Sequence, residues 1–458
     1  MSDETVRVAS GQGFWGDWQE APKLQVRHGP IDYLMLDYLA EITMSIMQKQ
    51  KDRDPEAGYA RDFVSLVADL APDLAENDVT VVSNAGGVNP RACVEAIADR
   101  LEDVETPRPL RVAMVRGDDL TGRLDELLEA GHELHNMETG ESMSAVRDRI
   151  QSANAYLGAR PIVQALETGA DVVVTGRSTD TALTYAPLVH EFGWEWDDWD
   201  RIAAGVVAGH INECGAQAAG GNTQHDWRSV ELTVPGYPIV EARPDGDFVV
   251  TKHPDLDGRV TWATVTEQLV YEMGDPTEYI TPDAAADFST IELEDLGDDR
   301  VRVSGVEGRP RTGQLKVSAS YRDGWKATGT LTYAWPDAHA KAQKADGILR
   351  ARLDRLGLAF DEIRTEYIGA GACHGPMAGS PSPDLPEVEM RVSVRAAGRD
   401  PVDRFTRELA PLILAGPPTV TGFAGGRPKP QEIMAFWPAL IDRDVVEDRV
   451  SVETVEAG

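Results

Sequence analysis

Residues 79–90 read VTVVSNAGGVNP, and this stretch decides the fold. The run of Val and Thr is typical of a buried strand, the glycine pair turns the chain, and Pro90 is a favoured first residue of a helix. A helical pattern then follows from Arg91 to about Leu101. Strand, glycine-rich turn and helix in this order are typical of a parallel α/β sheet, which binds ligands where its strands end.

The same succession recurs along the first part of the chain. Polar or glycine-containing turns also follow strand candidates at residues 6–9, 33–36, 111–115 and 171–175. We therefore predict an α/β fold with a predominantly parallel sheet flanked by helices over residues 1–228. Alternation and many turns predict a β-rich second subdomain ending in a long helix over residues 229–356. We predict a small C-terminal α/β unit over residues 357–458.

The composition is that of a foldable but strongly acidic protein. Lys and Arg total 44 against 77 Asp and Glu in 458 residues, which gives a net charge of −33. Because such a polyanion repels phosphate backbones and anionic lipid, binding to nucleic acid or to membrane surfaces is disfavoured. High salt screens the self-repulsion of charge spread along a chain, so we expect a halophilic protein. The alternative, a local acidic face for a basic partner, predicts clustering that the sequence lacks.

Cysteine usage and hydropathy indicate the compartment. Cys93, Cys214 and Cys373 are far apart and form no CxxC pair, so neither a disulfide framework nor a structural zinc site is expected. No apolar run approaches the ~20 residues of a membrane span. The first residues, MSDETVRVAS, lack the basic start and apolar stretch of a secretory signal. We expect a cytoplasmic protein.

The most informative loop reads TGRSTD at residues 175–180, directly after a predicted strand. A guanidinium held there, on Arg177, suits bidentate recognition of a carboxylate or phosphate. Asp180 could accept a proton, orient Arg177, or simply cap the following helix. Thr175 and Gly176 complete this predicted ligand loop.

Other turns supply further candidates for ligand binding. The SGQG turn at residues 10–13 lets backbone amides approach an anion, but it lacks the third glycine of a dinucleotide motif. The two carboxamides of residues 84–90 either hydrogen-bond a carboxylate or thioester carbonyl, or only cap and turn the chain. The expected ligand-binding residues here are Ser10, Gly11, Gly13, Asn84, Gly86, Gly87, Asn89, Asn154, Tyr156 and Lys252.

One predicted helix carries His210, Glu213 and Cys214, spaced so that all three can share a face. Such a face can bind a metal or transfer protons. The sequence has no HExxH motif, however, and a helix rich in small residues also suits a buried structural role. We expect no metal, and we name Glu213 as a candidate catalytic residue together with Asp180 and Arg177.

Taken together, these segments resemble the acyclic terpene utilisation AtuA-type family. The matching stretches occur in family order over about residues 5–345 and include SGQGFWGD (10–17), NAGGVNP (84–90), NAYLG (154–158), TGRSTD (175–180), HINECG (210–215), GGN (220–222) and LKV (315–317). The family has no agreed mechanism, so the candidate site rests on loop position and residue chemistry.

The resemblance implies a role in breaking down citronellol- and geraniol-like compounds through coenzyme A thioesters. We expect an enzyme acting on a branched acyl-CoA or related carboxylate in a hydratase- or lyase-like step, without a cofactor of its own. The alternative is a non-catalytic accessory subunit or scaffold of an acyl-CoA carboxylase system. The lack of a nucleophile triad, P-loop, metal motif or complete dinucleotide fingerprint favours that alternative. A homo-oligomer is also expected.

Overall fold

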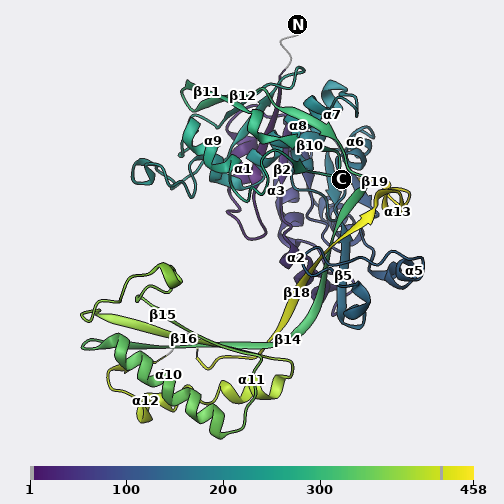
Figure 1. The fold of residues 1–458 in the computed structure, drawn as a ribbon. Coiled ribbons are helices and arrows are strands. Elements are labelled where there is room, and N and C mark those ends of the chain that lie inside the picture. Colours follow the sequence, from purple (N-terminus) through teal and green to yellow (C-terminus); the bar gives the residue numbers. More distant parts are fainter. Residues whose placement is uncertain (1–4, 423–425, 458) are drawn as a thin grey trace. The chain divides into compact units, whose positions relative to one another are not determined.

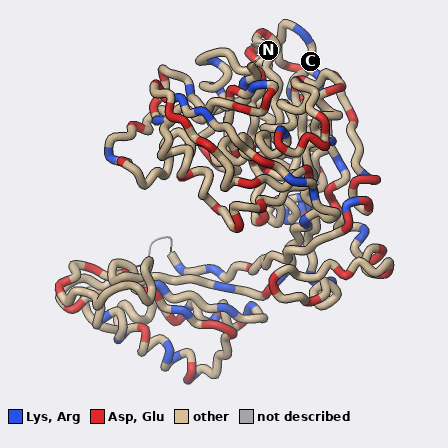
Figure 2. The backbone as a smooth tube through the Cα atoms, turned by 45° about the horizontal axis from the view of Figure 1, so that its top comes forward, with Lys and Arg blue, Asp and Glu red and all other residues tan. Residues whose placement is uncertain are grey.

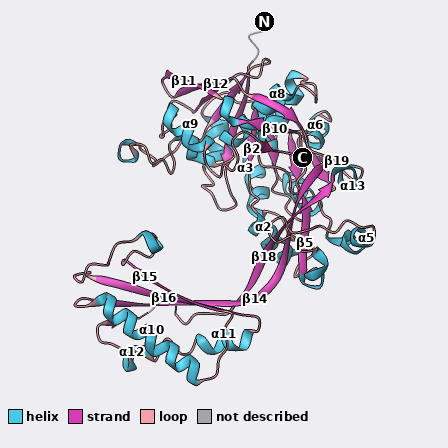
Figure 3. Cartoon of the chain, in the orientation of Figure 1, coloured by secondary structure: helices cyan, strands magenta, loops and turns pink. Residues whose placement is uncertain are grey.

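The computed structural model describes residues 5–422 and 426–457 (Figure 1). The chain divides into two compact units, Met1–Ser320 with Phe436–Gly458, and Tyr321–Ala435. Each unit contains strands with helices beside them (Figure 3). Acidic residues occur along the whole course of both units, interspersed with basic ones (Figure 2).

Within the described ranges, no helix combines the length and the apolar character that crossing a membrane requires.

The first unit is built on a ten-stranded sheet. In sheet order the strands are β11 (Glu292–Gly297), β12 (Arg300–Ser304), β8 (Phe248–Thr251), β7 (Ile239–Ala242), β1 (Val6–Gln12), β2 (Tyr33–Leu36), β3 (Thr80–Ser83), β6 (Val172–Thr175), β4 (Leu110–Arg116) and β19 (Ser451–Ala457). Strands β1, β2, β3, β6 and β4 pair with one another in parallel. These five are the strands that the sequence predicts.

The sheet as a whole is mixed, not predominantly parallel as the sequence predicts. On one side, β7 pairs antiparallel with β1, and β8, β12 and β11 continue antiparallel from there. On the other side, β19 pairs antiparallel with β4. The physical reason is that the hairpin-forming residues 239–304 extend the central sheet instead of building a sheet of their own.

Helices cover both faces of the parallel strands. Those of the first unit are α1 (Ala21–Arg27), α2 (Glu41–Lys51), α3 (Arg61–Asn77), α4 (Pro90–Leu101), α5 (Leu124–Glu129), α6 (Arg160–Leu166), α7 (Ala182–Phe192), α8 (Trp199–Asn212), α9 (Trp262–Leu269) and α13 (Arg443–Glu447). Helix α3 buries Phe63, Leu66, Leu70 and Leu74, a spacing that puts all four on one stripe. This stripe and α4 form a core with alternate residues of β2, β3 and β6. Helix α7 contacts β1, β2 and β3 outside that core and so covers the other face.

Further strands of the first unit lie beside this sheet. A three-stranded sheet has the order β13 (Glu307–Pro310), β10 (Ala284–Asp287), β9 (Tyr279–Ile280), and helix α8 packs against its first two strands. Strand β5 (Ile150–Ala155) pairs with β14 (Gln314–Ala334), as does β18 (Gln431–Asp442). The predicted domain boundary at residue 228 therefore falls inside one compact unit, because β7 is hydrogen-bonded to β1.

The second unit is an antiparallel sheet with helices. The sheet order is β15 (Glu362–Ile368), β16 (Glu387–Ala396), the later part of β14, and β17 (Val420–Thr421). Helix α10 (Ala338–Arg355) lies between β14 and β15 along the chain, and α11 (Arg399–Phe405) and α12 (Leu412–Ala415) lie between β16 and β17. Alternate residues of β16 are buried against the inner residues of α10, which makes a separate apolar core. The predicted boundary at residue 356 lies within this unit, directly after α10.

Candidate functional site

A pocket of about 1020 Å³ lies in the first unit, beside the carboxyl ends of the parallel strands. Loops after three of these strands contribute its charged wall: Asp17 after β1, Asp37 and Glu41 after β2, and Arg177 and Asp180 after β6. Parallel strands end at the same edge of a sheet, so side chains that are far apart in the sequence meet there. Residues following α8 and α9 add Glu213, Cys214, Tyr271 and Glu272.

Arg177 is a fixed, buried cation at the base of the pocket. Its side chain is 2% exposed, and its Nη1 atom donates a hydrogen bond of 2.5 Å to the carbonyl of Leu39 and lies 3.3 Å from Asp180 Oδ1. The guanidinium carbon stands 4.2 Å from the centre of the Tyr156 ring. Burial would lower the pKa of Arg177, but the surrounding carboxylates, Asp180 foremost, outweigh it and raise that pKa. The guanidinium therefore stays charged and keeps its position.

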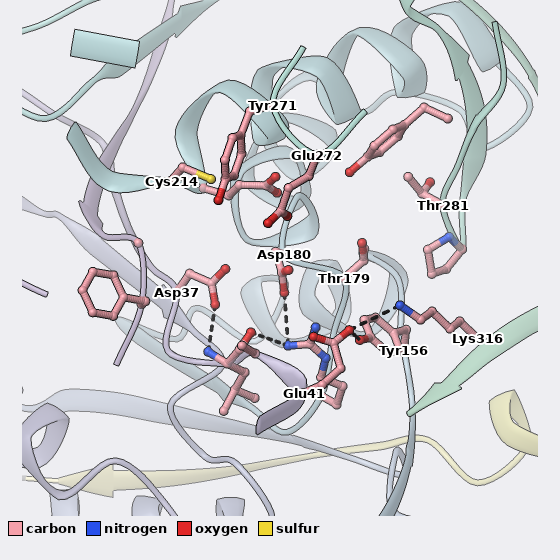
Figure 4. Close-up of a pocket in the computed structure, with 18 of the residues that line it drawn as sticks. Asp37, Glu41, Tyr156, Thr179, Asp180, Cys214, Tyr271, Glu272, Thr281 and Lys316 are labelled. Atoms are coloured by element: carbon pink, nitrogen blue, oxygen red, sulfur yellow. Dashed lines mark hydrogen bonds and ion pairs between the residues drawn. The ribbon is translucent and has the colours of Figure 1, made fainter. Parts of the chain in front are cut away.

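Asp37 and Asp180 point into the same space from neighbouring loops (Figure 4). Burial raises the pKa of Asp180 well above its usual range, although Arg177 opposes this. Burial also raises the pKa of Asp37 to about 6, against the hydrogen bond from Asn84. The Asp37 Oδ1 atom accepts hydrogen bonds from Leu39 N at 3.0 Å and from Asn84 Nδ2 at 2.7 Å. Burial therefore makes both carboxyls hold a proton more readily than an exposed carboxyl does.

A second charged group lies on the side of the pocket near β14. The Tyr156 hydroxyl donates to Glu41 Oε1 at 2.6 Å, and Lys316 Nζ lies 3.3 Å from the same oxygen. Burial opposes ionisation of Glu41, but the Tyr156 hydroxyl and Arg177 lower the pKa of that carboxyl to about 2. Lys316 also stands 4.7 Å from the centre of the Tyr156 ring. Glu41 is thus a permanent anion that holds both the phenol and the lysine (Figure 4).

His210 and Glu213 form a proton-sharing pair behind the wall. His210 Nε2 lies 3.0 Å from the carbonyl of Gln268, which can only accept, so this nitrogen carries a hydrogen. His210 Nδ1 lies 2.9 Å from Glu213 Oε1. Burial would lower the pKa of His210, but the Glu213 carboxylate outweighs it and raises that pKa. A proton on His210 is therefore stabilised by Glu213, which itself lines the pocket.

The sulfur of Cys214 also reaches the pocket (Figure 4). Burial raises the pKa of its thiol, so the sulfur stays protonated and is a poor nucleophile. Among the described residues, no group of three or more His, Cys, Asp or Glu side chains is placed to hold a metal ion.

Of the predicted site residues, the pocket wall formed by the described residues contains Gly13, Tyr156, Arg177, Asp180 and Glu213. The amide of Gly13 already donates to Asp17 Oδ2 at 2.9 Å. Within the chain, the SGQG turn therefore already binds a carboxylate, that of Asp17.

The other predicted site residues lie outside this wall: Ser10, Gly11, Asn84, Gly86, Gly87, Asn89, Asn154, Thr175, Gly176 and Lys252. The buried Asn84 binds Asp37 and also accepts from Tyr38 N at 2.7 Å, and Asn89 donates to the carbonyls of Pro55 and Ala57. The interpretation of this loop as a ligand clamp is thus not supported, since both carboxamides are used within the chain. Asn84 instead positions a pocket carboxylate.

The remaining predicted site residues outside the wall also have partners within the chain. Asn154 Nδ2 donates to Asp118 Oδ2 at 2.8 Å, and Lys252 Nζ donates to the carbonyl of Leu256 at 2.7 Å and lies 3.2 Å from Asp299. Gly86 and Gly176 are needed for close packing. A Cβ atom at these positions would lie 2.6 Å from the Thr175 carbonyl oxygen and 2.5 Å from Asp118, respectively.

Sequence reasoning missed several residues of the wall, foremost Asp37, Glu41 and Glu272. A signal existed for Asp37, because it directly follows a predicted buried strand, where a carboxylate is exposed to the ligand edge. Glu272 follows α9 and adopts a left-handed backbone conformation (φ 53°), which no local sequence pattern indicates. An apolar part of the wall was also not predicted and comprises Phe14, Met137, Ile280, Pro282, Leu315 and Leu440.

Comparison with protein families gives one match. The family described as "Acyclic terpene utilisation family protein AtuA" matches residues 6–452 of the chain. Neither the curated proteins nor the solved structures contain a match.

Proposed function

Because the chain belongs to the acyclic terpene utilisation AtuA family, we propose that it is an acid–base enzyme of branched-chain acid breakdown. Its substrate is an acyl-CoA or a related carboxylate with a branched chain. The reaction is a hydration or its reverse, or a carbon–carbon cleavage that needs the same proton transfers. The observation that carries this proposal is the pair of buried carboxyls, Asp37 and Asp180, whose pKa values burial raises beside the fixed Arg177.

In this proposal Asp37 is the general base and Asp180 is the general acid. Burial raises the pKa of Asp180 well above the usual range, which suits this carboxyl to the role of proton donor. Asp37, with a pKa of about 6, is mostly ionised at pH 7–8. Carboxyl groups whose pKa values burial raises toward neutral pH are typical of acid–base catalysis. Arg177 stabilises whichever carboxyl is charged at a given step.

In a hydration, Asp37 takes a proton from water while the water oxygen bonds to the β-carbon of the unsaturated acyl group. The electrons of the carbon–carbon double bond move to the thioester carbonyl, and Asp180 then gives its proton to the α-carbon. The sum is the addition of one water, and proton exchange with solvent restores both carboxyls. The reverse sequence removes water.

The pocket has room for such a substrate. Its volume of about 1020 Å³ lies at the upper end of the range for small-molecule sites. One part of the wall is charged, and another is apolar, with Phe14, Ile280 and Leu315 among its residues. A branched hydrocarbon tail against the apolar part leaves the acyl end beside Asp37 and Asp180.

The test is turnover by the purified protein at high salt. We expect it to hydrate the coenzyme A thioester of an unsaturated branched acid. The reaction would be monitored by the loss of the absorbance of the conjugated thioester. Asp180→Asn and Asp37→Asn should each lower kcat by at least about 100-fold, the usual contribution of a positioned acid or base. Asp99→Asn, an exposed carboxylate on α4, is the matched control and should leave kcat unchanged.

Full activity in both pocket variants would refute the assignment of the two carboxyls. Absence of turnover with a panel of such thioesters, together with stoichiometric recovery of acyl-CoA carboxylase subunits from cells, would refute the enzyme and favour the accessory role.

A further inference from the structure

We propose that the pocket accepts the acyl end of its ligand only as an uncharged group, a thioester, and excludes the corresponding free carboxylate. This inference rests on the proposed function and narrows its substrate class. It follows from the balance of charges in the wall and from the partners that these charges already have.

The wall is acidic. Among the described residues, its charged side chains are two cations, Arg177 and Lys316, and six carboxyls: Asp17, Asp37, Glu41, Asp180, Glu213 and Glu272. Figure 4 shows Glu272 facing Asp37 and Asp180 across the open space. A ligand carboxylate in this space would meet like charges from several directions.

Both cations already have partners within the chain. Arg177 lies 3.3 Å from Asp180 and donates to the Leu39 carbonyl, while one face of its guanidinium is covered by the Tyr156 ring. Lys316 lies 3.3 Å from Glu41, which the Tyr156 hydroxyl also binds. A free acid would have to compete with these internal partners for the two cations, and a thioester would not.

The donors suited to a neutral carbonyl are uncharged. Tyr271 and Tyr279 both line the pocket. Burial raises the pKa of Tyr279, and the nearby Glu272 charge raises that of Tyr271, so both phenols keep the hydrogen that a carbonyl oxygen accepts. A hydrogen bond of this kind needs no counter-charge. The same site therefore stabilises a thioester carbonyl and repels a carboxylate.

The experiment compares two ligands that differ only in this charge. Isothermal titration calorimetry at pH 8 in 1 M KCl would measure binding of the N-acetylcysteamine thioester of 3-methylbut-2-enoic acid and of the sodium salt of the free acid. These probes lack the nucleotide phosphates of coenzyme A, so only the acyl end is tested. We expect the thioester to bind at least about ten-fold more tightly, the effect of one uncompensated like charge a few ångströms away in a partly shielded site.

A charge-neutral variant sharpens the test. Glu272→Gln removes one negative charge from the wall and should tighten binding of the free acid by up to about three-fold, because Glu272 is exposed and 1 M KCl screens its charge. Binding of the thioester should change less than about two-fold. The matched control is Glu278→Gln, an exposed position shortly after it in the chain, which should alter neither.

Equal or tighter binding of the free acid would overturn the inference, as would an equal effect of Glu272→Gln on both probes. Binding of neither probe would also overturn it, because the pocket would then take no acyl end. Failure of this inference can be distinguished from failure of the proposed function. A thioester that binds preferentially but is not converted upholds the inference and removes the enzyme. Preferential conversion of a free acid overturns the inference but upholds the enzyme.

Discussion

Replacement of Asn84 by Ala tests whether this carboxamide positions Asp37 or binds a ligand. Asn84 is fully buried, donates to Asp37 Oδ1 at 2.7 Å and accepts from Tyr38 N at 2.7 Å. A hydrogen bond to a charged group contributes about 1.5–3 kcal/mol, and a buried amide N–H without an acceptor costs about 1–3 kcal/mol. We therefore expect Asn84→Ala to lower the free energy of unfolding by about 3–5 kcal/mol.

The same variant should alter the pH dependence of activity. The hydrogen bond from Asn84 lowers the pKa of Asp37, which burial brings to about 6. Without this donor the pKa rises further, so the acid limb of kcat/KM should move to higher pH.

Urea denaturation in 1 M KCl and a pH–rate profile would measure the two effects. Asn89→Ala is the matched control, because that carboxamide donates only to the carbonyls of Pro55 and Ala57. It should lose about 1–2 kcal/mol and leave the acid limb in place. The reasoning would be refuted if Asn84→Ala lost less than about 1 kcal/mol and raised only KM, since the carboxamide would then serve the ligand.

Two further predictions concern charge. The pKa of Asp37 is about 6 in the folded chain against an ordinary value of 3.8, so only the unfolded state ionises between these values and stability falls as the pH rises. Both hydrogen bonds to Asp37 are accepted by Oδ1, so the Asp37→Asn side chain can keep them. We expect this substitution to stabilise the protein by up to about 3 kcal/mol at pH 8 and by about 1 kcal/mol at pH 4.5. An equal gain at both pH values in denaturation experiments would contradict this. The net charge of −33 should make the melting temperature rise steadily from 0.1 M to 2 M KCl, and a flat dependence in calorimetry would argue against the expected salt-rich cytoplasm.

The parallel centre of the fold could be predicted because its strands are continuous apolar runs that end in turns. Every residue of strands β2 and β6 is buried, so both sequences are the apolar runs that are typical of a sheet covered on both faces. The extension of that sheet by β7 could not be predicted, since the alternation of Ile239–Ala242 is equally compatible with a separate sheet. Which strand lies next to β1 depends on contacts over 200 residues away in the sequence.

The predicted residues that line the pocket include Arg177 and Asp180, which a single loop brings there. Predicted polar residues with a distant partner inside the chain lie outside the pocket wall. Lys252 meets Asp299, and Asn84 meets Asp37, and nothing local to either residue indicates this. A polar side chain after a strand has the same appearance in the sequence whether it faces the ligand or supports a neighbour.

The pairing of β19 with β4 has a consequence for biosynthesis. Strand β19 comes from Ser451–Ala457, whereas its partner is complete at Arg116, so the ribosome makes more than 300 residues between them. At about 5–20 residues per second, the backbone hydrogen-bonding groups of β4 stay without their final neighbour for roughly 20–70 seconds. An open strand edge is a template for mispairing with other nascent chains. Faithful production of this protein therefore depends on protection of that edge until the last segment has left the ribosome.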